Sequence, residues 1–305
     1  MGLLLELYVS SIERVFGCFN PKPSTPFTLV GAPLDVTASY RPGTRFAPTT
    51  IRHAACNIEF YSLRSGIDFE DVGVRDLGDI VVSPGVIEDN LERIAKVSRE
   101  IIDSGGRLIV LGGEHLVTYG VIKGLLKFKP CLLYLDAHFD LRNEYLGLKL
   151  SHASTLRRII ELLGATRVFV VGVRAFTKSE LEYARKHSVK HITPLQLRLL
   201  GLRETSRRIR NWMENCETLY LSVDMDVFDP AYAPGVSNPE PEGVDPTSIL
   251  DLLYMVLDKR LIGFDIVEVS PPYDYGDITS ILAAKMIVEI ASKLYVDLRL
   301  RRTKV

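Results

Sequence analysis

The chain has 305 residues, of which 47% are apolar and 25% are charged, and its formal net charge is -1. This composition is typical of a globular protein with a substantial core, and it excludes a fibrous or intrinsically disordered chain. A net charge so close to zero gives no electrostatic reason to expect binding to nucleic acid.

The N-terminal segment, residues 1–17, contains a short apolar run that Glu6 interrupts. No basic residue precedes this run, so it lacks the layout of a signal peptide. We expect an amphipathic helix or strand there instead. No apolar run along the chain reaches the ~18 residues that a membrane span needs. We therefore expect a cytoplasmic protein that does not bind membranes.

The four cysteines stand far apart in the sequence. No two of them form a CxxC pair, and none has a histidine at the spacing of a metal site. Reduced and mostly buried thiols are the expectation for a cytoplasmic chain, and a structural disulfide is the alternative in a protein from a hyperthermophile. The residues are Cys18, Cys56, Cys131 and Cys216.

Short β-rich segments alternate with helical segments along most of the chain. Helices are expected near 86–106, where the apolar residues share one face, at 246–258, where Asp245 and Pro246 form a helix start, and near 279–295. Strands are expected at 27–35, 107–113, 131–140, 167–174, 218–226 and 261–271.

This alternation predicts an α/β fold with a parallel sheet that helices cover on both faces. No linker rich in Gly, Ser or Pro divides the chain, and the Pro-rich segment 227–244 lies between two strands of the same pattern. We therefore expect a single domain over residues 1–305. In such a sheet, sites form at the carboxyl ends of the strands.

Acidic residues and histidines gather where three of the predicted strands end. After residues 131–135 they alternate with a period of two, so that they can project to one side of the strand. Carboxylates that are buried together without partners are costly, and bound cations offset that cost. The residues are Asp136, His138 and Asp140, then Asp224 and Asp226, and Glu114 and His115.

Four aspartates and two histidines form a mixed oxygen and nitrogen donor set. Such a set suits Mn²⁺ or another first-row metal better than Mg²⁺. Two ions that share carboxylates would lie ~3.5–4 Å apart, as in two-metal hydrolytic sites. Taken alone, an Asp-x-Asp pair or a glycine pair at a strand end also occurs in ordinary turns. The coincidence of all three at strand ends favours a metal site.

These stretches resemble the ureohydrolase family, which includes arginase and agmatinase, and they are most similar to an archaeal agmatinase. The resemblance extends from about residue 27 to 296. The matching stretches are RPGTRFAPTTIR (41–52), GGEHLVTYG (112–120), DAHFDLR (136–142), SHAS (151–154), SVDMDVFDPAYAPG (222–235) and DIVEVSPPYD (265–274).

The resemblance implies a three-layer α/β/α sandwich around an eight-stranded, mostly parallel sheet, and a homo-oligomer, either a trimer or a hexamer. It also implies two Mn²⁺ per chain, with Asp136 and Asp224 bridging them. The first ion would bind His115, Asp136, Asp140 and Asp224, and the second His138, Asp136, Asp224 and Asp226. Leu116 stands where the family usually has serine, so a hydrogen bond behind the metal site is expected to be lost.

The resemblance further implies hydrolysis of a guanidino group to urea, with two metal ions activating water. Glu268, at the end of an apolar strand, is expected to bind the guanidinium through paired hydrogen bonds. His152 is expected to protonate the leaving amine, because an imidazole titrates near neutrality. Asp140 counts among the catalytic residues as well as among the ligands.

Agmatine, hydrolysed to putrescine and urea in polyamine biosynthesis, is the expected substrate. The loop LRNEYLGLKLSHAS (141–154) resembles that of archaeal agmatinases rather than the Ser/Asn-rich loop of arginases. Glu144, or Asp274 and Asp277, would receive the second cation of agmatine. Arg142 would repel that cation unless it pairs with Glu144, and it could instead favour the carboxylate of arginine.

Other substrates and other classes of protein stay open. N1-Aminopropylagmatine, arginine and further guanidino compounds are alternative substrates. A metal-dependent amidohydrolase acting on a different substrate is a second class, because a fold does not determine a function. A non-catalytic guanidine-binding protein is a third, although it would require a broken ligand set.

Overall fold

The structure is a computed structural model that describes residues 3–13, 15–19, 24–83 and 85–299. Residues 1–2 and 300–305 of the predicted domain lie outside this range. The helices are α1 (Leu3–Tyr8), α2 (Ala47–Ala55), α3 (Ile87–Asp103), α4 (Leu116–Leu125), α5 (Thr155–Leu163), α6 (Lys178–Lys186), α7 (Pro194–Met213), α8 (Pro246–Val256) and α9 (Ile278–Arg299). The strands are β1 (Val9–Ser10), β2 (Phe27–Ala32), β3 (Tyr61–Ser62), β4 (Ile67–Asp68), β5 (Arg75–Ile80), β6 (Arg107–Gly112), β7 (Cys131–Leu135), β8 (Val168–Val171), β9 (Lys190–Ile192), β10 (Leu219–Asp224) and β11 (Leu261–Val267).

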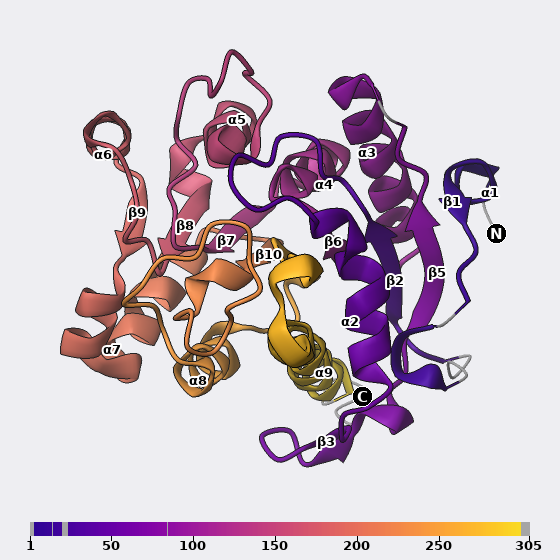
Figure 1. Ribbon diagram of the computed structural model, residues 1–305. Coiled ribbons are helices and arrows are strands. Elements are labelled where there is room, and N and C mark those ends of the chain that lie inside the picture. The colour runs from indigo at the N-terminus through magenta and orange to yellow at the C-terminus, as the bar shows by residue number, and fades with distance from the viewer. Residues whose placement is uncertain (1–2, 14, 20–23, 84, 300–305) are drawn as a thin grey trace.

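The central sheet has the order β1-β5-β2-β6-β11-β10-β7-β8-β9 (Figure 1). Within the described residues, every pairing from β5 to β9 is parallel, so the predicted eight parallel strands are confirmed. The two-residue strand β1 adds a ninth, because the segment after α1 pairs antiparallel with the outer edge of β5. Strands β3 and β4 form a separate small sheet.

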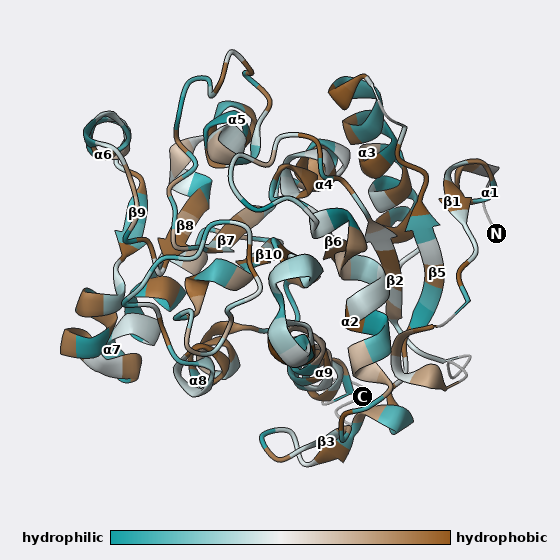
Figure 2. Ribbon diagram, viewed as in Figure 1, coloured by the Kyte–Doolittle hydropathy of each residue, from teal (hydrophilic) through white to brown (hydrophobic). Residues whose placement is uncertain are grey.

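Helices cover both faces of this sheet, as the predicted sandwich requires. One hydrophobic cluster packs α2, α7, α8 and α9 against one face, with Ile51 and Ile287 among its members. The other packs α1, α3, α4, α5 and α6 against the opposite face, through residues such as Ile94 and Val121. The buried strands β7 and β8 are mostly hydrophobic in Figure 2, whereas α6 is hydrophilic. Among the described residues, no helix has the length and apolar character that crossing a membrane requires.

Strand β5, Arg75–Ile80, is the element that the sequence pattern misses. Its sequence, RDLGDI, contains two aspartates and a glycine and does not read as a buried strand. Both aspartates form ion pairs with the buried Arg52 of α2, at 2.8 Å for Asp76 and 2.6 Å for Asp79. Arg52 therefore balances the negative charges of Asp76 and Asp79, which lie 24 and 27 positions after it in the sequence.

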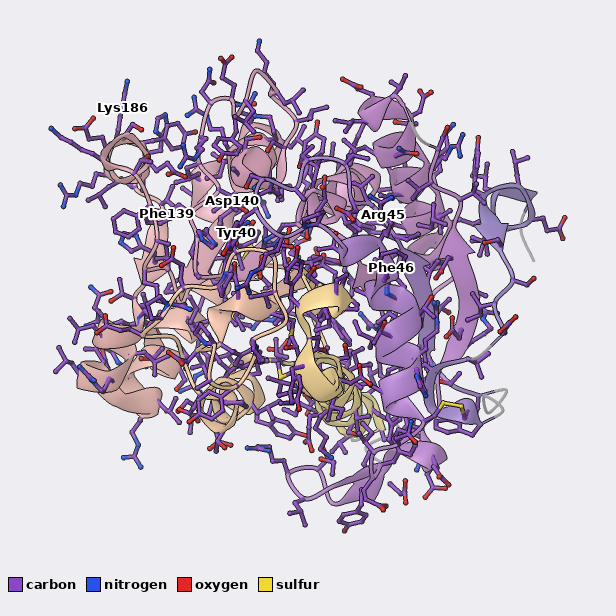
Figure 3. All side chains as sticks on the ribbon, viewed as in Figure 1. Tyr40, Arg45, Phe46, Phe139, Asp140 and Lys186 are labelled. Atoms are coloured by element: carbon purple, nitrogen blue, oxygen red, sulfur yellow. A yellow bond between two sulfur atoms is a disulfide. The ribbon has the colours of Figure 1, made fainter. Side chains whose placement is uncertain are left out.

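The expectation of reduced thiols is wrong. Cys18 and Cys56 form one disulfide, visible beside α2 in Figure 3. Cys131 and Cys216 form a second disulfide, although they are 85 positions apart in sequence, and their Cα atoms are 5.8 Å apart. Cys131 opens β7 and Cys216 precedes the adjacent β10, so that the sheet itself brings them together. None of the cysteines is free.

Candidate active site

The carboxyl ends of four neighbouring strands, β6, β11, β10 and β7, meet at the middle of one edge of the sheet. Leu135 of β7 lies opposite Val223 of β10, and Asp224 of β10 lies opposite Val267 of β11. The residues that follow these positions therefore emerge side by side. The register alone brings Asp136 and Asp224 together, while Glu268 follows β11.

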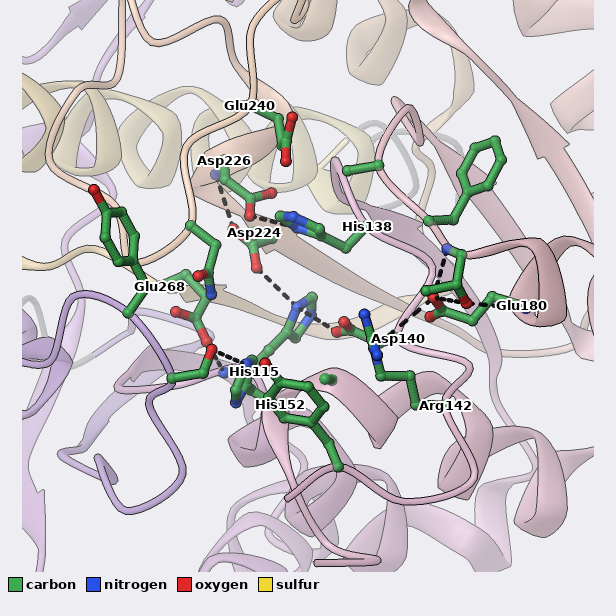
Figure 4. A pocket seen from close by; sticks show the side chains of 18 of the residues that line it. His115, His138, Asp140, Arg142, His152, Glu180, Asp224, Asp226, Glu240 and Glu268 are labelled. Carbon is green, nitrogen blue, oxygen red and sulfur yellow. Dashed lines mark hydrogen bonds and ion pairs between the residues drawn. The ribbon is translucent and has the colours of Figure 1, made fainter. Parts of the chain in front are cut away.

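The six predicted ligands lie together at this edge, and we call them the carboxylate–histidine cluster: His115, Asp136, His138, Asp140, Asp224 and Asp226. Three carboxylates surround one nitrogen, Nδ1 of His115. The nitrogen lies 2.9 Å from Asp224 Oδ2, 3.1 Å from Asp136 Oδ2 and 3.6 Å from Asp140 Oδ2 (Figure 4).

The second imidazole, His138, faces the other side of Asp136. Its Nδ1 lies 2.9 Å from Asp226 Oδ2 and 3.6 Å from Asp136 Oδ1. Two groups of potential ligand atoms thus share Asp136: one with His115 and Asp224, and one with His138 and Asp226. This is the pattern of two adjacent cation sites with a common carboxylate.

The cluster fits divalent cations because its two imidazoles compensate the charge of four aspartates only in part: they lower the pKa of Asp136, but not those of Asp140 and Asp224. Asp136 Oδ2 is buried and makes no hydrogen bond within the described part of the chain. Burial, and then the charge of Asp136, raises the pKa of Asp140 well above its usual value. Burial and the charge of Asp226 do the same for Asp224. Carboxylates in this position need a cation, and the mixed donor set suits a first-row metal.

Hydrogen bonds behind His115 fix which nitrogen faces the cluster. Its Nε2 lies 3.0 Å from Ser222 Oγ, and that hydroxyl donates to Asp265 Oδ1 at 2.6 Å. The Nδ1 lone pair is therefore free to bind a cation. Leu116 cannot donate a hydrogen bond from its side chain, and Ser222 is a hydrogen-bond partner of the His115 ring. Leu116 instead packs in the core.

Tyr134 also supports the cluster, although the sequence analysis did not identify it. Its ring stacks on His115 with the centroids 4.4 Å apart, and its hydroxyl donates to Asp140 Oδ2 at 2.9 Å. Tyr134 lies two positions before Asp136, so the period of two that predicted Asp136, His138 and Asp140 on one side of the strand also includes Tyr134.

Two residues of the site adopt a backbone conformation that is rare outside glycine. Asp140 has φ +50° and Glu268 has φ +65°. Non-glycine residues with positive φ carry strain that the surrounding structure must maintain, and they concentrate at functional sites. Both side chains line the same pocket.

Glu268 lies at the end of β11, where the sequence analysis placed it. Its Oε1 accepts a hydrogen bond of 2.6 Å from the backbone N–H of His115, and burial raises its pKa to about 7. The carboxyl group is thus anchored next to the cluster and lines the pocket. A carboxylate in this position can bind a guanidinium.

His152 lines the same pocket from the segment His152–Ser154. Its Nδ1 lies 3.1 Å from Thr37 Oγ1, and its Nε2 lies 3.2 Å from Ser39 Oγ. Burial, and then the positive charge of His138, lowers its pKa to about 4. This shift favours the neutral imidazole at pH 7, and the part of His152 in proton transfer stays a prediction.

The pocket has a volume of about 450 Å³, and three charged residues line it beyond the cluster and Glu268. Arg142 Nε lies 3.9 Å from Glu180 Oε2, and its guanidinium lies over the ring of Tyr145. Glu180 is buried and accepts hydrogen bonds from Thr177 and Leu141. Glu240 is half-buried, and its carboxylate has no hydrogen-bond or ion-pair partner among the described residues.

The three carboxylates that were predicted to receive the second cation of the substrate do not line the pocket. Glu144 is exposed and does not line the pocket, and Arg142 pairs with Glu180 instead of with it. Asp274 is buried and accepts hydrogen bonds from Thr279 and Ser280 at the start of α9. Asp277 is exposed and also lies outside the pocket lining.

Comparison with known proteins places these observations in one family. Residues 25–292 match the model of the arginase family. The agmatinase of Bacillus anthracis is 34% identical over 266 residues, covering 86% of this chain and 89% of that protein. The mitochondrial guanidino acid hydrolase of Homo sapiens is 34% identical over 272 residues, covering 87% of this chain and 77% of that protein.

A solved structure agrees with the sequence comparison. The agmatine ureohydrolase of Thermoplasma volcanium superposes with a TM-score of 0.87 at 34% sequence identity, covering 95% of this chain and 97% of the other. The nearly complete coverage means that the similarity includes the sheet, the helices on both of its faces and the loops at the strand ends. Together with the matched model, it shows that this chain belongs to the arginase family.

Proposed function

We propose that the protein is a ureohydrolase that uses two Mn²⁺ per chain to hydrolyse agmatine to putrescine and urea. The observation that carries the proposal is the carboxylate–histidine cluster, with its shared Asp136 and an oxygen that lacks any hydrogen-bond partner. One ion would bind His115, Asp136, Asp140 and Asp224, and the other His138, Asp136, Asp224 and Asp226. When bound, the two ions supply the Lewis-acid chemistry that makes water a nucleophile at neutral pH.

The other residues of the pocket bind the substrate and move a proton. The carboxylate of Glu268 binds the guanidinium by charge-assisted hydrogen bonds and fixes its orientation. Cleavage of the C–N bond releases an amine, which must gain a proton as it leaves. The lowered pKa of His152 favours the neutral imidazole, which first accepts a proton from the attacking water and then gives it to that amine.

The charge of the pocket favours a substrate with a second cation. Arg142 is paired with Glu180, and the carboxylate of Glu240 lines the pocket away from the cluster and Glu268, where only the nearby charge of Arg174 acts on it among the described residues. The backbone carbonyl of Glu240 accepts a hydrogen bond of 2.7 Å from Arg174, which holds this loop in place. A terminal amine can pair with Glu240, whereas the carboxylate of a guanidino acid would be repelled.

Sequence identity cannot make this choice, because the agmatinase and the guanidino acid hydrolase above are equally similar to this chain. A urea-release assay of the Mn-loaded protein on agmatine, N1-aminopropylagmatine, arginine and 4-guanidinobutyrate decides the matter. We expect the highest kcat/KM for agmatine. Faster hydrolysis of 4-guanidinobutyrate than of agmatine would contradict the proposed substrate while leaving the ureohydrolase chemistry intact.

The variant Glu240→Gln sharpens this test. Removing the charge should lower kcat/KM for agmatine about fivefold, because a half-buried ion pair contributes about 1 kcal/mol, and it should not lower kcat/KM for 4-guanidinobutyrate. The matched control is Glu144→Gln, which removes an exposed carboxylate outside the pocket and should change neither substrate.

Organisation and location complete the proposal. We propose that the whole chain forms one ureohydrolase domain, that it assembles into a trimer or hexamer, and that it works in the cytoplasm. Size measurement in solution tests the assembly.

A further inference from the structure

A buried chain of hydrogen bonds behind His152 connects it to a carboxylate that the proposed function does not use. Glu114 and Thr37 are both buried. Thr37 Oγ1 donates to Glu114 Oε1 at 3.0 Å, and this hydroxyl oxygen of Thr37 lies 3.1 Å from Nδ1 of His152. It also accepts the backbone N–H of His152 at 3.0 Å. One hydroxyl thus holds both the ring and the backbone of His152.

The segment around Thr37 is itself firmly attached to the strand end that carries Glu114. Backbone N–H groups of Val36 and Thr37 donate to Glu114 Oε2 at 2.9 and 2.7 Å. The backbone N–H of Glu114 donates to the carbonyl oxygen of Leu34 at 2.7 Å. Gly113 allows this approach, because a Cβ at that position would collide with the backbone of Leu34. Glu114 and Thr37 therefore form one rigid unit.

The hydrogen-bond chemistry of this unit determines the tautomer of His152. Both carboxyl oxygens of Glu114 accept here, because the backbone N–H groups of Val36 and Thr37 donate to Oε2 and the hydroxyl of Thr37 donates to Oε1. The single hydroxyl hydrogen of Thr37 is therefore used toward Glu114, so Thr37 Oγ1 can only accept from the imidazole. The proton of neutral His152 then lies on Nδ1. Its Nε2 carries the lone pair and accepts from Ser39 Oγ in the pocket.

We infer that Thr37 and Glu114 are positioning residues that hold His152 in the Nδ1–H tautomer, with Nε2 ready to take a proton from the reaction. When Nε2 is protonated, the Nδ1–H bond to the Thr37 hydroxyl is kept, so the ring holds its orientation. A third group that orients a catalytic base is a recurrent feature of acid–base sites. This inference rests on the role proposed for His152.

The test is a double-mutant cycle on the Mn-loaded protein with agmatine. Thr37→Val removes the hydroxyl at nearly constant volume and should lower kcat about tenfold or more, within the about 10²–10⁴-fold that an acid–base residue contributes. KM should change little. Thr37→Ser restores the hydroxyl and should recover most of kcat. In a His152→Asn background, Thr37→Val should have no further effect on kcat.

A matched control separates positioning from folding. Thr44→Val removes another buried hydroxyl from the same segment, one that donates only to the carbonyl oxygen of Leu34. It should cost similar stability and leave kcat unchanged. If Thr37→Val does not fold, Glu114→Gln takes its place in the cycle and should also lose kcat only when His152 is present.

The outcomes of the two proposals are distinguishable. A normal kcat in His152→Asn would overturn the proposed function of that residue. A large loss in His152→Asn together with a normal kcat in Thr37→Val would overturn the positioning role alone. An equal loss from Thr37→Val with and without His152 would also overturn it, since the effect would then be structural.

Discussion

Two clusters of buried carboxylates in this protein differ in how their charge is balanced. The Arg52 cluster consists of Arg52, Asp76 and Asp79, and the Arg52 side chain donates to Asp76 at 2.8 and 3.0 Å, to Asp79 at 2.6 Å and to the carbonyl oxygen of Gly78 at 3.0 Å. The carboxylate–histidine cluster has four aspartates against two imidazoles and a buried oxygen without a hydrogen bond.

Whether the chain itself balances the charge distinguishes a structural charge cluster from a functional one. Arg52 brings a rigid fork of donors that matches its carboxylates, so this cluster is complete within the chain. The carboxylate–histidine cluster is not complete, and its pKa values show the cost: burial raises those of Asp140 and Asp224 well above normal. It requires cations from outside the chain.

Removing the shared carboxylate should have the largest effect. Asp136→Ala takes a ligand from both candidate ion sites, so we expect it to lose most of the bound Mn²⁺ and nearly all urea release. Metal analysis of the purified variant measures the first and the urea assay the second. Unchanged metal content would show that Asp136 does not hold the ions.

Removing the proton-transfer group should come next. His152→Asn should keep the metal content and lower kcat about 10²–10⁴-fold, because the leaving amine then lacks a positioned proton donor. Steady-state kinetics at neutral pH, with metal analysis of the same sample, gives both quantities. A variant as active as the wild type would exclude His152 from proton transfer.

Breaking the complete cluster should affect stability instead of chemistry. Arg52→Ala leaves the buried carboxylate of Asp76 and the half-buried one of Asp79 without their cation, so we expect a loss of about 3–5 kcal/mol in the free energy of unfolding. Urea release per folded molecule should stay normal. The matched control is Arg64→Ala, whose partner Asp251 is 41% exposed, and which should cost at most about 1 kcal/mol. Equal losses in the two variants would mean that burial of the Arg52 cluster is unimportant.

Neutralising the guanidinium-binding carboxylate should have the smallest of these effects. Glu268→Gln keeps the size of the side chain but removes its charge. The transition-state stabilisation that kcat/KM measures should therefore fall by roughly 2–5 kcal/mol for every guanidino substrate. Metal content should not change, because Glu268 is not a ligand. The ratio of agmatine to arginine hydrolysis should also be preserved. Intact kcat/KM would remove Glu268 from substrate binding.

The sequence predicts the parts of this molecule that depend on local periodicity. The carboxyl ends of parallel strands lie at the same edge of a sheet. This rule and the period of two after Leu135 were enough to place Asp136, His138 and Asp140 beside Asp224. The family and the three-layer fold are confirmed by the comparisons and by the sheet. Polar strands such as β5 were missed, because Asp76 and Asp79 are compensated only by tertiary contact with Arg52.

Residues that depend on how distant loops fold could not be predicted. Thr37 contacts Glu114 and His152, which lie 77 and 115 positions later in the sequence. Residues so far apart form no local pattern from which the contact could be predicted. The same holds for Glu240, which lines the pocket in place of Glu144. The pairing of the cysteines could not be predicted for the same reason, since they meet only in the folded chain.

The most direct test of the central claim is the stoichiometry of Mn²⁺ binding to the metal-free wild-type chain, measured by equilibrium dialysis. We expect two ions per chain, because two groups of ligands share Asp136. We also expect urea release from agmatine to appear as these ions bind. A chain that folds and binds no Mn²⁺, or that binds a single ion with full activity, would contradict the two-ion site.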